Sequence, residues 1–107
     1  MRALLDENMP QAFRFHLPGH DVQTAGFLHF AGLSNGELLR KMVEAKIQVL
    51  ITLDKNLQFQ QNVAKAGIAV IVLRPKTSKL HDVVPLAAGA LRAIETVQAG
   101  HVVVISP

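Results

Sequence analysis

Acidic side chains follow the apolar segments of this chain at the points where those segments end. Asp6 and Glu7 come directly after the apolar residues 3–5, and Asp54 comes directly after the largely apolar residues 48–53. Magnesium and manganese ions prefer carboxylate and amide oxygens as ligands, with water in their remaining positions. A metal ion held in this way activates water and neutralises charge on a phosphate. These residue types therefore point to metal-assisted phosphodiester hydrolysis.

Most of the acids are expected at one end of the molecule. Five of the eight fall just after a predicted strand or early in the helix that follows one: Asp6, Glu7, Glu37, Asp54 and Asp82. Three asparagines accompany them as supporting polar residues: Asn8, Asn35 and Asn56. Because like charges repel, such a cluster needs either a compensating cation, for which a hard divalent ion is suited, or raised pKa values of the carboxyl groups. We expect Asp6, Glu37 and Asp54 to be the catalytic residues and, with Glu7, the metal ligands.

Three of these acids have an alternative explanation. Glu37 and Asp82 lie in the first turn of predicted helices, where a carboxylate is stabilised by the helix dipole by roughly 0.3–1 kcal/mol. Glu7 points away from Asp6 if the strand continues, because successive side chains alternate. It is then either a second metal ligand or a solvated residue.

Basic side chains are predicted near the same end of the molecule. Lys55, Arg74 and Lys76 follow two of the predicted strands and could hold the backbone of a nucleic acid. The alternative is a solvated rim, since lysine and arginine are mostly surface residues. The formal charge of +3 fits a polyanionic partner such as RNA, and it equally fits ordinary solubility.

Strands and helices must alternate to position these side chains. Five strands are predicted, at residues 3–5, 20–25, 48–53, 68–73 and 101–106. Four helices are predicted, at residues 11–17, 36–45 with Asn35 as the cap, 56–66, and 80–97 with a bend near Pro85. This alternation predicts an α/β domain of three layers, with helices on both faces of a mostly parallel sheet. In such sheets ligands bind beyond the carboxyl ends of the strands.

The composition limits the class of protein. The 107 residues are half hydrophobic and suit one domain, 1–107. The absence of cysteine excludes disulfides and thiolate metal sites and suits the cytoplasm, and the short apolar runs predict no membrane segment. Five phenylalanines without tyrosine or tryptophan argue against a base-stacking platform. Phe27 and Phe30 are predicted to be core residues, since phenylalanine is most often buried, and the alternative is an exposed patch for a partner.

Four segments, in order, resemble one branch of the PIN-like domains: LLDENMP, GHDV, NGELL and LITLDKNLQFQQN. That branch consists of small stand-alone proteins grouped with the toxin halves of toxin–antitoxin pairs. The resemblance implies a PIN-like fold and a ribonuclease site that depends on Mg²⁺ or Mn²⁺. Asp6 and Asp54 correspond to its acids after strands one and three, and the NGELL segment supplies Glu37. The resemblance also implies RNA as substrate, an antitoxin protein as partner, and pairing of two copies as a homodimer.

The chain departs from the PIN-like pattern at two positions. Asn35 stands where many relatives have an aspartate, and the fourth acid of a PIN site corresponds to Asn56 or is absent. An amide can coordinate a metal ion but brings no charge. A second hypothesis is therefore a binding module that engages a partner protein or RNA through its acidic pocket without turnover. A receiver-like signalling domain with Asp54 as phosphate acceptor would need a lysine after the fifth strand, and the chain has none there.

Overall fold

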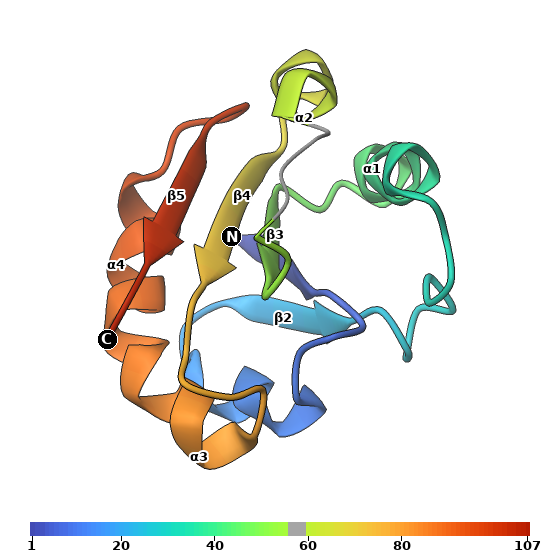
Figure 1. Ribbon diagram of the computed structural model, residues 1–107. Coiled ribbons are helices and arrows are strands. Elements are labelled where there is room, and N and C mark those ends of the chain that lie inside the picture. The colour runs from blue at the N-terminus through green and yellow to red at the C-terminus, as the bar shows by residue number, and fades with distance from the viewer. Residues whose placement is uncertain (56–59) are drawn as a thin grey trace.

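Five short segments form one parallel sheet in the computed structural model, which describes residues 1–55 and 60–107 (Figure 1). The strands are β1 (Arg2–Leu5), β2 (Asp21–Thr24), β3 (Val49–Thr52), β4 (Ala69–Leu73) and β5 (Val102–Ile105). They lie in the order β2-β1-β3-β4-β5, and every adjacent pair is parallel. The prediction of a parallel sheet of about five strands is confirmed.

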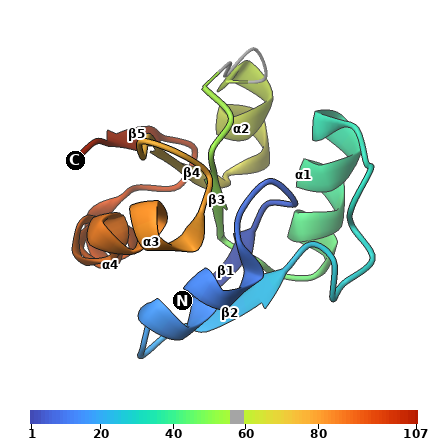
Figure 2. The same cartoon turned by 60° about the horizontal axis from the view of Figure 1, so that its bottom comes forward.

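Helices cover both faces of the sheet and complete the three layers (Figure 2). One face carries α1 (Asn35–Glu44) and α2 (Gln60–Ala66). The other face carries η1 (Gln11–His16), α3 (Leu80–Val83), η2 (Val84–Leu86) and α4 (Ala87–Thr96). No helix in the described ranges combines the length and the hydropathy that crossing a bilayer requires.

The core lies on both sides of the central strands. Leu5 and Ile51 pack among the side chains of η1, α3 and α4, while Leu4 and Leu50 pack among those of α1 and α2. All four are at most 1% exposed. Because both faces are covered, the central strands β3 and β4 are buried along their whole length and are not alternating, whereas the edge strand β2 is only partly buried. The residues that follow them emerge from a rigid support.

Two predicted helices begin or break at specific side chains. Ser34, and not Asn35, caps α1, because the Ser34 hydroxyl accepts a hydrogen bond from the Glu37 amide at 3.3 Å. Asn35 is therefore the first residue of the helix. The segment predicted at 80–97 bends at Pro85 as expected and divides into α3, η2 and α4, since proline cannot donate to the preceding turn.

The loops that follow β1 to β4 gather at one end of the sheet because the strands run in the same direction. We call this end the carboxyl edge. It comprises residues 6–9, 25–28, 53–55 and 74–78. The loop after β3 continues into residues 56–59, which lie outside the described part of the chain.

Candidate functional site

The buried hydroxyl of Thr52 links the two loops that carry Asp6 and Asp54. Thr52 ends β3 and is 0% exposed. Its Oγ1 donates to Asp6 Oδ2 at 2.8 Å and accepts from the Asp54 amide at 3.1 Å. Because β1 and β3 are neighbouring parallel strands, the acids that follow them meet on the same edge. We call these three residues the Asp6–Thr52–Asp54 centre.

The carboxylate of Asp6 is oriented by neutral donors. Its Oδ1 accepts from the Glu7 amide at 2.9 Å, and its Oδ2 accepts from the Thr52 hydroxyl. The Asp6 amide in turn donates to the carbonyl of Ile51 at 2.9 Å. A carboxylate has about four lone-pair sites, so two bonds leave room for a cation. Magnesium commonly takes one or two protein carboxylates and completes its shell with water and substrate phosphate. The Asp6 carboxylate therefore fits as one ligand of such an ion.

Asn8 ties the same two loops together. Its Oδ1 accepts from the Leu53 amide at 3.3 Å, and its Nδ2 lies 3.5 Å from Thr52 Oγ1. The loop after β1 is thus connected to the loop after β3 by two different side chains. The supporting role predicted for Asn8 corresponds to this position.

Thr52 is the residue of this centre that the sequence interpretation missed. A signal was present, because Thr52 is the polar residue in the apolar run VLIT and stands two positions before Asp54. A buried hydroxyl nearly always has a hydrogen-bond partner. A threonine at the end of a buried strand, next to an acid, therefore indicates a hydrogen bond to the loops beyond the strand.

The other two predicted acidic ligands have partners in the local structure. Glu37 Oε1 accepts from the Ser34 hydroxyl at 2.8 Å, so the two residues form a capping arrangement at the start of α1. Glu7 is exposed, and its Oε2 accepts from the Gly32 amide at 3.1 Å. Within residues 1–55 and 60–107, no three acids or histidines lie close enough to share a metal ion.

Asn35 and Asn56 were predicted, like Asn8, to be supporting polar residues, and the structure describes the first of these two. Asn35 is exposed at the first position of α1. Asn56 lies outside the described residues. Asp82, which was also expected at this end, accepts from the hydroxyl of Thr77 at the start of α3. Its position matches the alternative explanation, in which an acid stabilises a helix N-terminus.

Two pockets flank the Asp6–Thr52–Asp54 centre along the edge. A pocket of about 240 Å³ lies between the ends of β1 and β2, and its walls include Asp6, Glu7 and Gly26. A second pocket, of about 180 Å³, lies at the ends of β3 and β4. Its walls include the three side chains predicted to bind a nucleic-acid backbone, all of them exposed: Lys55, Arg74 and Lys76. We call this second pocket the basic pocket.

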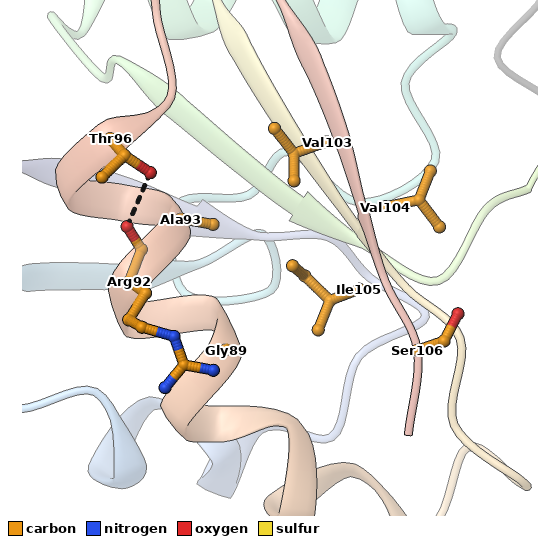
Figure 3. Close-up of a pocket in the computed structure, with 8 residues that line it drawn as sticks. All are labelled: Gly89, Arg92, Ala93, Thr96, Val103, Val104, Ile105 and Ser106. Carbon is orange, nitrogen blue, oxygen red and sulfur yellow. Dashed lines mark hydrogen bonds between the residues drawn. The ribbon is translucent and has the colours of Figure 1, made fainter.

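A larger hollow lies away from these loops, between α4 and β5 (Figure 3). Its volume is about 420 Å³. Val103 and Ile105 point from β5 toward α4, and a Cβ at Gly89 would lie only 2.9 Å from Ile105 Cγ2. The glycine therefore lets the helix approach the strand closely. No carboxylate or histidine is among the described residues that line this hollow, and Arg92 is its charged side chain. Its described lining therefore lacks the acidic side chains that the carboxyl edge provides.

Comparison of the chain with family models, with curated proteins and with solved structures gave no match. PIN-like membership therefore stays a prediction from the four sequence segments. The parallel five-stranded sheet with helices on both faces agrees with the predicted fold class.

Proposed function

We propose that this protein is a divalent-metal-dependent ribonuclease that cleaves RNA at its carboxyl edge. The observation that carries the proposal is the hydrogen-bond chain through Thr52, which links the loops of Asp6 and Asp54. The basic pocket adjoins the loop that carries Asp54, because Lys55 of that loop is one of its lining residues. Two acid-bearing loops joined through Thr52, beside a basic pocket, suit a substrate that is itself negatively charged and whose reacting phosphate requires a metal ion.

Each part of this edge has a defined task in the proposal. Asp6 and Asp54 would hold magnesium or manganese, which would supply an activated water and neutralise charge on the phosphate. Thr52 keeps the Asp6 carboxylate in one orientation, and Asn8 keeps the two loops at a constant separation. The three cations of the basic pocket attract backbone phosphates, which contribute most of the affinity of nucleic-acid binding without sequence preference.

The resemblance to PIN-like toxins adds the cellular setting of the proposal. On that basis the protein is the toxin half of a toxin–antitoxin pair in the cytoplasm, and an antitoxin protein is its partner. Pairing of two copies would be a further property of that family. Coexpression with a small protein encoded beside this one, followed by size-exclusion chromatography, would detect both the complex with an antitoxin and the homodimer.

A cleavage assay with matched acid variants tests the enzymatic proposal. Wild-type protein is incubated with RNA and Mn²⁺ and compared with Asp54→Asn and Glu95→Gln. We expect Asp54→Asn to lose more than about 100-fold in rate, since even residues that support metal ligands contribute 10- to 100-fold. Glu95 is an exposed acid on α4, and its variant should cleave like the wild type. Undiminished cleavage by Asp54→Asn would rule out this assignment of the site.

A binding module without turnover is the second candidate. It is favoured by one observation: Glu7 and Glu37 are bonded to Gly32 and Ser34, and no three acids or histidines of the described residues lie close enough to share a metal ion. Under this hypothesis the wild type retains RNA or a partner protein but cleaves no RNA in the presence of Mn²⁺. Cleavage that is abolished by EDTA would exclude it.

A further inference from the structure

Phe27 presents an exposed aromatic ring in the loop after β2. Its side chain is 68% exposed, whereas Phe30 in the same loop is partly buried against the core beneath α1. The prediction that Phe27 is a core residue is therefore wrong, and its exposure agrees with the alternative of an exposed side chain. Phe15 is exposed to a similar extent, at 72%, but the Arg14 guanidinium lies over its ring, 4.7 Å from the centroid. Among the described residues, no ring or cation contact involves Phe27.

The loop that presents Phe27 is braced from both ends. At its start, the Phe27 amide donates to Thr24 Oγ1 at 3.2 Å, and the Leu28 amide donates to the Thr24 carbonyl at 3.1 Å. Thr24 is itself buried. At the far end, the Gly32 amide donates to Glu7 Oε2. The ring therefore projects from a supported turn, and Glu7 connects that turn to the tip of β1.

An aromatic ring, two acids and the basic pocket follow one another along the carboxyl edge in the order of the strands. Phe27 lies after β2, and its neighbour Gly26 shares a pocket with Asp6. The two acids lie after β1 and β3, and the basic pocket lies after β3 and β4. Neighbouring strands are about 4.8 Å apart, so this series spans about 14 Å from β2 to β4.

We propose that Phe27 is a stacking surface for one unpaired base of the RNA, on the β2 side of the Asp6–Thr52–Asp54 centre. This is a single ring, and not the platform of several rings against which the composition argues. This inference rests on the proposed function, because it places the reacting phosphate at that centre. The basic pocket then holds the backbone on the β4 side. Stacking on an aromatic ring tolerates any base, since every base has a π-face. It requires that base to be unpaired. Phe27 therefore gives the protein a preference for single-stranded over double-stranded RNA.

Binding in EDTA tests this inference apart from catalysis. The anisotropy of a fluorescent eight-nucleotide RNA is measured with wild-type protein, Phe27→Ala, Phe27→Trp and Phe15→Ala, and again after the RNA is paired with its complement. We expect Phe27→Ala to weaken single-strand binding by about 5- to 150-fold, which corresponds to about 1–3 kcal/mol for one stacked base. Phe27→Trp should bind at least as well as the wild type. Phe15→Ala is the matched control and should not differ from it.

Each of the remaining outcomes has a defined meaning. Unchanged affinity in Phe27→Ala overturns the inference and leaves the ring as a contact for a protein partner, while Mn²⁺-dependent cleavage would still support the proposed function. Equal weakening in Phe27→Ala and Phe15→Ala also overturns it, because the effect would not be specific to this edge. Equal loss for single-stranded and paired RNA removes the preference for unpaired bases. Failure of the wild type to bind any RNA overturns both proposals.

Discussion

Asp21, at the amino end of β2, and Asp6, beyond the carboxyl end of β1, are held by different partners. Asp21 Oδ2 pairs with Arg2 Nε at 3.2 Å, and its Oδ1 accepts from Gln23 at 2.8 Å. Arg2 also donates to the carbonyl of Ala45. At this end of the sheet the negative charge of Asp21 is therefore balanced by the positive charge of Arg2.

Asp6 has the same residue type but a different surrounding. Its two oxygens accept from the Glu7 amide and the Thr52 hydroxyl, which are neutral, and no ion pair in the described ranges involves it. The carboxylate is therefore oriented while its charge remains uncompensated by the fold. The comparison teaches that charge balance, and not the presence of an acid, distinguishes Asp21 from Asp6, and the proposed metal site depends on this difference.

The largest effect is expected when the charge of Asp6 is removed, and removal of the charge of Asp21, at the other end of the sheet, is the control. Calorimetric titration with Mn²⁺ should show affinity reduced by more than about 100-fold in Asp6→Asn. Asp21→Asn should bind Mn²⁺ like the wild type and lose at most about 1 kcal/mol of unfolding free energy, because its ion pair is half-exposed. Equal Mn²⁺ affinity in the two variants would break the distinction between the two ends.

Two buried threonines provide the next contrast. Thr52→Val removes the hydroxyl that orients Asp6, and we expect about 10- to 100-fold weaker Mn²⁺ binding with a loss of about 1–3 kcal/mol in stability. Thr24→Val also removes a buried hydroxyl, the one that accepts from the Phe27 amide. It should lose stability to a similar degree and keep its Mn²⁺ affinity. Chemical denaturation and calorimetry separate the two quantities.

If the basic pocket binds backbone phosphates, it should contribute to the salt dependence of RNA affinity. The triple variant Lys55→Ala/Arg74→Ala/Lys76→Ala should bind single-stranded RNA more weakly, and the slope of log affinity against log salt should fall by about 2, at about 0.7 for each phosphate contact. A control variant with the same charge change, Arg40→Ala/Lys65→Ala/Arg92→Ala, alters cations that line other hollows. Equal slopes in the two variants would mean that the field of the whole protein, and not this pocket, attracts the RNA.

The smallest effect is expected at the start of α1. Ser34→Ala removes the cap and should lower the unfolding free energy by about 1 kcal/mol, without changing Mn²⁺ affinity. Glu37→Gln keeps a side chain that can still accept from Ser34, and its Mn²⁺ affinity should also be unchanged. A large loss of Mn²⁺ binding in Glu37→Gln would establish Glu37 as the third ligand predicted from the sequence.

The sequence alone was enough to predict the sheet and the edge that carries the acids. Apolar runs such as VLIT and AVIVL are short, β-branched and separated by helical segments, and these are local properties. The direction of the strands follows from the alternation with helices. Once the direction is known, a residue directly after a strand, such as Asp6 or Asp54, must lie at the carboxyl end. The break at Pro85 was equally local, because proline lacks the amide that the helix needs.

Only the tertiary structure decided which side chains work together. Thr52 bonds to Asp6 because the strand order places β3 beside β1, and strand order is not written in any local pattern. The bond of Glu37 to Ser34, in contrast, is local, because Ser-x-x-Glu is a capping pattern that the sequence already contained. Phe27 is exposed while Phe30 is partly buried, because the turn after β2 directs them differently. Periodicity places a residue on an element, whereas contacts between segments depend on packing and on hydrogen bonds that form only in the folded chain.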